Sequence, residues 1–253
     1  FGDLSAVSES FAGSGNNIKG IVGGGNQGPY AGMDVITIAS TGGGTDFGDL
    51  TQARRDLGST SNQIRQVFGG GAAPDISNII DFLQIASLGN ASDFGDLAAA
   101  NRGNSGSSVS HNGLELGLPQ RPSVTYMPGS GRGLFGGGYA PGTTDVITQI
   151  NIPTLGNLSD FGNLLAARAA AGGASSLTRA LFLGGTTGAG GTNNDDNVIQ
   201  FIEMQSRGNC GDFGNLSGVA YKCSGLASTT RAVVALGVAG GSDSDTLEFV
   251  TIA

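Results

Sequence analysis

The sequence contains no tryptophan and a single histidine, and each scarcity excludes a kind of functional site. A Ser-His-Asp triad would have to use His111. A copper or zinc centre with several histidine ligands cannot be built at all. The aromatic platforms expected of a carbohydrate-processing enzyme are scarce as well, because the chain has only 4 tyrosines. We therefore expect a protein without enzymatic activity and without a cofactor.

Cysteine, positive charge and long apolar runs are also in short supply. Lysine and arginine number 12 against 20 acidic residues, and the net charge of −8 disfavours binding to nucleic acid or to an anionic membrane. No apolar run approaches the roughly 18 residues that a membrane-spanning helix needs. The only cysteines are Cys210 and Cys223. We predict two small buried thiols there, with a disulfide as the alternative.

Glycine, in contrast, is abundant, with 47 of 253 residues. The glycines follow no G-X-Y period, which excludes a collagen-like triple helix. They cluster as GG or GGG between apolar runs, a pattern typical of tight turns between short strands. With 38% hydrophobic residues, the composition is compatible with a packed globular core.

A short motif, Phe-Gly-x-Leu, occurs five times at spacings of 46, 47, 67 and 52 residues. Its phenylalanines and leucines, which we expect to pack within the repeated unit, are Phe1, Leu4, Phe47, Leu50, Phe94, Leu97, Phe161, Leu164, Phe213 and Leu216. Repeats of this length are typical of arrays, solenoids and propellers. The five copies divide the chain, taken as a single domain over residues 1–253, into units that start at 1, 47, 94, 161 and 213.

Each unit carries further motifs in a fixed order. A basic residue, two apolar residues and glycines form segments such as "RQVFGGG", and a β-branched run such as "DVITIAS" follows after a variable loop. These segments predict four short strands per unit, which we name a to d from the axis outward, with Phe-Gly-x-Leu as strand d. The apparent helix "LLAARAAAGG" aligns with strands in the other units. The sequence therefore predicts an all-β fold, a five-bladed β-propeller of four-stranded blades.

The pattern of "RQVFGGG" followed by "DFGDL" and an alanine-arginine pair resembles kelch-type repeats, with phenylalanine where kelch repeats carry tryptophan. Segments such as "GNASDFGDL" are similar to repeats of structural and tail-fibre-type proteins of marine tailed phages, cyanophages in particular. This resemblance implies a virion or extracellular location. It also implies partners among other virion proteins or host surface receptors and glycans, and a place as one domain of a longer or oligomeric assembly.

The two ends of the repeat array are out of phase. Phe1 to Leu4 form a strand d with no strand c before it, and the last apolar run, residues 246–253, has no strand d after it. We predict that the N-terminal strand closes the last blade and so removes two open sheet edges.

One column of basic residues recurs at the start of strand b, and one column of aspartates recurs before strand d. The basic column is Lys19, Arg65, Arg132, Arg179 and Arg231, and the strand-end aspartates are Asp46, Asp93, Asp160 and Asp212. Both columns lie at the same end of a blade, so we predict that each arginine pairs with an aspartate. The alternative is a cationic ring that grips an anionic partner.

Departures from the repeat are the best candidates for partner binding. The third unit has an insertion between strands a and b, residues 103–131, which contains His111, Tyr126 and Met127. We expect this arm to bind a partner, and the loops between strands b and c form a second candidate surface at the other face. A weak calcium candidate comprises Asp243, Asp245 and Glu248.

The function that best fits these features is a non-enzymatic structural or host-recognition module of a virus particle, such as a capsid decoration, tail or fibre component, acting through protein–protein contacts. The alternative is a lectin-like propeller that binds glycans. A glycosidase-type propeller is a distant third, because such enzymes use paired carboxylates near the axis and only Glu9 and Asp56 are acidic in the a-strand segments.

Overall fold

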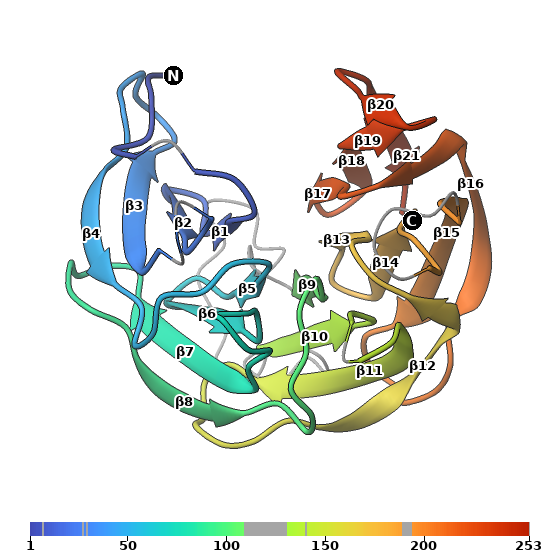
Figure 1. Cartoon of the computed structure of the whole chain (residues 1–253), viewed down its shortest axis with the longest axis horizontal. Helices are drawn as coiled ribbons and strands as arrows, with labels where there is room; N and C mark the ends of the chain where they lie inside the picture. Colours follow the sequence, from blue (N-terminus) through green and yellow to red (C-terminus); the bar gives the residue numbers. More distant parts are fainter. Residues whose placement is uncertain are drawn as a thin grey trace, which may run out of the picture.

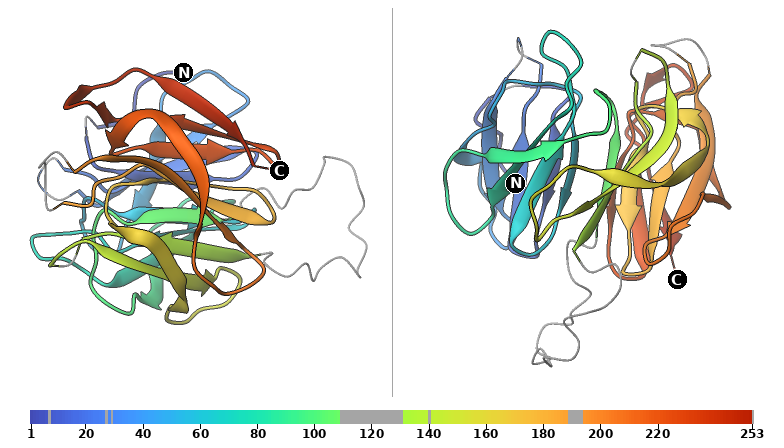
Figure 2. Two further views of the ribbon diagram at one scale, coloured as in Figure 1. Left: turned by 90° about the vertical axis from the view of Figure 1, so that its right-hand side faces the viewer. Right: turned by 90° about the horizontal axis from the view of Figure 1, so that it is seen from below.

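The computed structural model describes residues 1–6, 8–26, 28, 30–108, 131–139, 141–188 and 194–252. This part of the chain contains strands and turns and no helix, so it offers no helix that could cross a membrane. Five antiparallel sheets surround a common axis, which confirms the predicted five-bladed β-propeller (Figure 1). The side views show the sheets packed face to face around that axis (Figure 2).

The strands follow one another in chain order. Blade 1 comprises β1 (Ala12–Gly15), β2 (Lys19–Gly23), β3 (Gly32–Thr37) and β4 (Thr45–Asp49). Blade 2 comprises β5 (Gly58–Ser61), β6 (Arg65–Gly69), β7 (Ile79–Gln84) and β8 (Ser92–Asp96). Blade 3 comprises β9 (Ser105–Ser108), β10 (Arg132–Gly136), β11 (Thr144–Asn151) and β12 (Ser159–Arg168). Blade 4 comprises β13 (Gly172–Ser175), β14 (Arg179–Leu183), β15 (Asp196–Glu203) and β16 (Gly211–Tyr221). Blade 5 comprises β17 (Ser224–Ala227), β18 (Arg231–Ala235) and β21 (Leu247–Thr251).

Within blades 1 to 4 the strands pair in the predicted order a, b, c, d. The blade 4 sheet is larger than predicted, because a small hairpin, β19 (Val238–Ala239) and β20 (Ser242–Asp243), extends it from the edge of β16. Blade 5 is smaller than predicted: its sheet has the order β17-β18-β21 and contains no strand d among the described residues. The segment "LLAARAAAGG" falls in β12 and β13, so the strand interpretation of it is confirmed.

The buried apolar side chains of the described residues form four clusters, one at each contact between blades that follow one another in the chain. Phe68 of blade 2 lies in one cluster with Ile21 and Phe47 of blade 1, and Phe182 of blade 4 lies in another with Phe161 of blade 3. Both faces of an inner blade are therefore buried, which explains why strand b is apolar at consecutive positions rather than alternating. Most of the stabilisation by apolar burial arises where one blade meets the next.

Glycine is required where a strand d meets the next blade. In the Phe-Gly-x-Leu motif of blade 1, Gly48 has φ 139° and lies next to the register shift in the pairing of β3 with β4. A Cβ atom there would be 2.5 Å from the carbonyl oxygen of Gly89, in the turn of blade 2. The motif therefore keeps its glycine because two backbones approach each other too closely for any side chain.

The basic column forms contacts between blades. Lys19 Nζ donates to the carbonyl oxygen of Ile85 at 3.1 Å, Arg65 Nη1 donates to that of Pro153 at 2.9 Å, and Arg179 Nη1 donates to that of Ile252 at 3.2 Å. Arg132 makes the same contact to Met204. Each cation thus holds the end of strand c in the following blade, and several also lie over a phenylalanine ring, as Arg65 lies over Phe82 at 5.0 Å.

The predicted pairing of this column with the strand-end aspartates is wrong. None of the ion pairs of the described residues involves Asp46, Asp93, Asp160 or Asp212, and all four residues are exposed. Strand alternation is the reason: Phe47 points into the core, so its neighbour Asp46 points to solvent. Asp46 Oδ1 instead accepts from the N–H of Gly48 at 3.2 Å, within its own strand β4.

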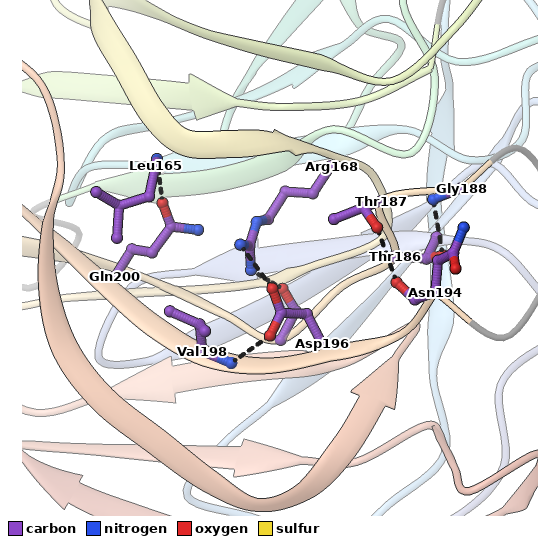
Figure 3. A network of polar contacts seen from close by, with 10 residues as sticks. Leu165, Arg168, Thr186, Thr187, Gly188, Asn194, Asp196, Val198 and Gln200 are labelled. Atoms are coloured by element: carbon purple, nitrogen blue, oxygen red, sulfur yellow. Dashed lines mark hydrogen bonds and ion pairs between the residues drawn. The ribbon is translucent and has the colours of Figure 1, made fainter.

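A different arginine column forms ion pairs between blades, and the arginine of each pair is buried. Arg54 and Asp81 are both fully buried and pair directly, and Arg54 Nη1 also donates to the carbonyl oxygen of Gly70 at 2.7 Å. Burial lowers the pKa of the Arg54 guanidinium, and the carboxylate of Asp81 opposes that shift. Arg168 repeats the arrangement with Asp196 at 3.0 Å between blades 3 and 4 (Figure 3).

The prediction that the N-terminal strand closes the last blade is also wrong. Phe1 to Leu4 form no strand and do not join the sheet of β21. Their hydrogen bonds go to the turn after β3: the N–H of Gly2 donates to the carbonyl oxygen of Gly42 at 2.9 Å, and Asp3 accepts from Gly44 at 2.7 Å. Figure 1 shows this segment beside blade 1, on the other side of an opening in the ring from blade 5.

We expect Arg65→Ala to lower the free energy of unfolding by about 1–2 kcal/mol, because two carbonyl groups of blade 3 lose a charged donor and Phe82 loses its cation. Chemical denaturation followed by far-ultraviolet circular dichroism measures the change, since the chain has no tryptophan whose fluorescence could be followed. The matched control is Arg207→Ala, an exposed arginine, which should change stability by less than about 0.5 kcal/mol. Equal effects of the two variants would contradict the inter-blade role.

For the buried pair we expect Arg54→Met to cost about 3–5 kcal/mol, because the carboxylate of Asp81 is left buried without its cation. The double variant Arg54→Met/Asp81→Leu should be more stable than the sum of the two single variants implies, since it removes both charges. Denaturation of the wild type, both single variants and the double variant gives the coupling. Additive effects would show that the pair contributes no interaction of its own.

Candidate functional site

A cavity of about 430 Å³ lies on the propeller axis. Its walls come from strand a of every blade and from the residues just before each strand. Among the lining groups are the side chains of Ser59 and Ser105 and the backbone of several glycines, so the wall is polar but carries few long side chains. We call the end of the propeller that carries the loops between strands b and c the b–c face.

Five residues at matching positions before strand a have left-handed backbone, all with φ between 54° and 62°. They are Ser10, Asp56, Gly103, Ala170 and Lys222, one from each blade. The N–H of Asp56 donates to the carbonyl oxygen of Ser10 at 2.9 Å, and the N–H of Gly103 donates to that of Asp56 at 2.8 Å. Left-handed backbone is uncommon outside glycine, and its recurrence in every blade makes it a feature of the architecture. These hydrogen bonds fix the cavity wall.

Charged side chains of both signs surround the cavity at the b–c face. Glu9, Asp56 and Lys222 line it, and Arg102 Nη1 lies 3.9 Å from Asp56 Oδ2 with about a third of each side chain exposed. Glu9 accepts a hydrogen bond from the amide of Asn26 at 2.9 Å. Such exposed pairs add little to stability, so these groups are free to exchange partners with a ligand.

Three of the four tyrosines lie at the same end of the molecule. Tyr30 and Tyr139 are in loops between strands b and c, and Tyr221 ends β16. The guanidinium of Arg102 lies 5.2 Å from the ring centre of Tyr139, and Lys222 Nζ lies 5.9 Å from that of Tyr221. We call this group, together with the residues of the previous paragraph, the tyrosine rim. Partly buried rings beside cations offer contact area and hydrogen-bond donors to a partner.

Asn104 is the most unusual polar residue of the cavity wall. It is 6% exposed, and neither its Oδ1 nor its Nδ2 has a hydrogen-bond partner among the described residues. A buried amide in this state is uncommon, because each unsatisfied group costs free energy. No repeat pattern points to this amide, since the equivalent positions are Phe11, Leu57, Ala171 and Cys223.

A second polar column was not identified from the sequence. Acidic or amide side chains in strand c accept hydrogen bonds from the residue that follows Phe-Gly-x-Leu in the preceding repeat. Asp34 accepts from the N–H of Ser5 at 2.7 Å, and Gln200 accepts from that of Leu165 at 2.6 Å (Figure 3). The sequence does contain a sign of this column. An acidic residue occurs at the equivalent position of three apolar strand c segments, in "MDV", "IDF" and "LEF".

The weak calcium candidate is divided among structural roles. Glu248 of that candidate accepts hydrogen bonds from the backbone and hydroxyl of Ser217, as a member of the column just described. Asp243 lies in β20 and Asp245 lies in the loop that follows. Within the described ranges, no group of three or more possible ligands forms a metal site.

The other predicted binding residues belong to the arm of the third unit. His111, Tyr126 and Met127 lie outside the described residues, as does most of the arm at 103–131. The predicted arm surface therefore stays a prediction, whereas the loops of the b–c face can be described in part.

Cys210 and Cys223 are both buried and free, as predicted for two small apolar side chains. Burial raises the pKa of the Cys210 thiol to about 12 and that of the Cys223 thiol to about 11. Cys223 lines the axial cavity. A thiol with such a pKa is almost wholly protonated at neutral pH and is a poor nucleophile.

No protein-family model matches the sequence, and a search of curated proteins finds no match.

We expect iodoacetamide at pH 8 to modify neither cysteine of the folded protein within minutes, because the pKa of each thiol lies about three or more pH units above that pH. In denaturant both should react at the rate of free cysteine. Mass spectrometry of quenched samples counts the modified thiols. Rapid modification of Cys223 in the folded state would show that the cavity exposes a reactive thiolate.

Proposed function

We propose that this chain is a non-enzymatic structural or host-recognition module of a virus particle, and that it binds a protein partner through its b–c face. The observation that carries the proposal is the tyrosine rim, in which Tyr139 and Tyr221 lie beside Arg102 and Lys222. Tyrosine and arginine are enriched in the energetically dominant parts of protein interfaces. The rim lies on loops and strand ends that the repeat does not constrain, where scaffolds usually place function.

The repeated polar residues support this assignment because their hydrogen bonds and ion pairs are made within the molecule. Arg54, Arg65 and Asp81 act within or between blades, so a binding function falls to positions that differ from blade to blade. The context of a virus particle rests on the resemblance of the repeats to those of tail-fibre-type phage proteins. Short strands joined by tight glycine turns suit a particle exposed to the environment.

A lectin-like function is the second candidate, and one observation favours it. Glu9, Asp56 and Lys222 of the tyrosine rim line a polar cavity whose wall also contains the unpaired amide of Asn104 and the residues Ser59 and Ser105. Sugar hydroxyls hydrogen-bond to such groups, and sugar rings pack on tyrosine. The two functions differ in the chemistry of the partner, so an experiment can separate them.

We expect fluorescently labelled protein to bind intact cells of a cyanobacterial host panel, as measured by flow cytometry, and mass spectrometry to find the chain in purified particles of the parent virus. Protease treatment of the cells should abolish binding if the partner is a protein, whereas periodate oxidation should abolish it if the partner is a glycan. A particle without this chain would overturn the proposal of a virion role.

Variants locate the surface. The double variant Arg102→Ser/Tyr139→Ser should weaken cell binding at least about tenfold, because a guanidinium and an aromatic ring leave the rim together. Arg207→Ser is the matched control, since Arg207 is exposed in the turn before β16, at the opposite face. Equal binding by all three proteins would place the recognition surface elsewhere.

A further inference from the structure

The contact between consecutive blades has two halves, and the same two halves recur at every interface. The leading half belongs to strands b and c of one blade: a cation at the start of b and an apolar residue at the start of c. The trailing half belongs to the next blade: the carbonyl group and the buried side chain at the end of its strand c. Arg65 of blade 2 and the carbonyl groups of Ile152 and Pro153 in blade 3 are one example.

Blade 5 carries a leading half against which no following blade packs among the described residues. Leu247 is 69% exposed, whereas its counterparts Met33, Ile80 and Ile147 are at most 1% exposed. Arg231 is the fifth member of the basic column, and its contact among the described residues is the ring of its own blade's Phe249, at 4.6 Å. The outer edge of β21 has no paired strand among these residues. Phe249 and Leu226 are 62% and 67% exposed on the same blade.

Blade 1 carries the matching trailing half, and no blade of the described residues packs against it either. Ile38 is 49% exposed, whereas its counterparts Ile85, Ile152, Met204 and Ile252 are at most 1% exposed. Its carbonyl group is the counterpart of those that Lys19, Arg65, Arg132 and Arg179 bind in the other interfaces.

Blade 1 also holds a strand d that belongs to the missing contact. Asp3 accepts from the N–H of Gly44 at 2.7 Å, as Asp49 accepts from Ala91 and Asp96 from Leu158 in the regular interfaces. Residues 1–4 thus lie on blade 1 as β4 lies on blade 2. Phe1 is 75% exposed, in contrast to 2% for Phe47, because no strand c lies beside it.

We propose that these two surfaces bind each other between molecules, so that blade 5 of one copy docks on blade 1 of a second copy. We call the two surfaces together the seam: Leu226, Arg231, Leu247 and Phe249 on blade 5, and residues 1–4 and Ile38 on blade 1. Docking pairs β21 with residues 1–4 of the second copy, places Arg231 against the carbonyl group of Ile38, and buries Leu247 and Phe249. The contact is head-to-tail, because its two halves are different.

A second copy fits better than the chain's own blade 1. Blades 1 and 5 lie on opposite sides of the opening in Figure 1, and four packed interfaces, two of them with an arginine–aspartate pair, set that separation. Bringing the two halves together within one molecule would shift all four interfaces. A second copy can dock on the open face as a rigid body. This inference does not depend on the proposed function, because the tyrosine rim and the seam share no residue.

Sedimentation velocity over a range of protein concentrations tests the proposal. We expect the wild type to populate species of two or more chains as the concentration rises. Leu247→Ser should lower the association constant at least about tenfold, because a leucine buried at the seam is lost. The matched control is Leu88→Ser, which changes an equally exposed leucine, 66% against 69%, in the turn between β7 and β8. A wild type that stays monomeric at every concentration, or equal effects of the two variants, would overturn the proposal.

A cross-link distinguishes contact between molecules from contact within one. Asp3 and Thr246 are the counterparts of Asp49 and Gly32, which pair across β3 and β4. Mixing a chain that carries Asp3→Cys with one that carries Thr246→Cys should yield a disulfide-linked heterodimer under mild oxidation. Cys210 and Cys223 are buried, so a wild-type mixture serves as the background. If no heterodimer forms, while the double variant Asp3→Cys/Thr246→Cys links within a single chain, the seam closes within one molecule and the proposal fails.

Discussion

The contact between consecutive blades is the interaction on which the rest of this structure depends. A single blade of four short strands has too little apolar area to fold alone, and here both faces of an inner sheet are covered by neighbours. The repeated residues are accordingly those that act at this contact. Phe47 and its counterparts fill it, Gly48 allows two backbones to meet, and Arg65 binds the following blade from one end. The buried pair of Arg54 and Asp81 adds a polar contact that fixes how the blades are oriented.

Residues that hold the blades together can therefore be told apart from residues that are available for function. A residue type that recurs in four or five blades has the same structural task wherever a following blade packs against it. Charge is no exception, since four of the five basic residues bind carbonyl groups of the next blade. The tyrosine rim has no such recurrence: Tyr30, Tyr139 and Tyr221 occupy different places in their units. Its position beside the axial cavity, on loops that a rigid ring holds in place, is where a partner can be bound without disturbing the blades.

The fold could be predicted because the length of the repeat, the positions of its turns and the order of its strands can all be read from local sequence. The contacts of the charged columns depend on side-chain direction, which the prediction of Arg–Asp pairing ignored. Asp46 stands next to the inward-pointing Phe47, so strand alternation sends it to solvent. The strand c acids that do accept hydrogen bonds, Asp34 and Asp81, appear singly in apolar runs and act across blades. The unpaired amide of Asn104 had no counterpart to reveal it.

The error over the N-terminal strand follows from the same repetition. Phase in the sequence shows that residues 1–4 and β21 complement each other, and the structure agrees, because residues 1–4 lie on blade 1 as every other strand d lies on its following blade. Complementarity does not say which molecule supplies the partner. Any array of identical interfaces ends in two surfaces that fit each other, and solenoid proteins normally cover those ends with polar capping repeats. Here Leu247 and Phe249 at one end and Ile38 at the other remain apolar and exposed. Exposed apolar surfaces of this kind mark interaction sites, and the partner that matches both halves is another copy of the same array.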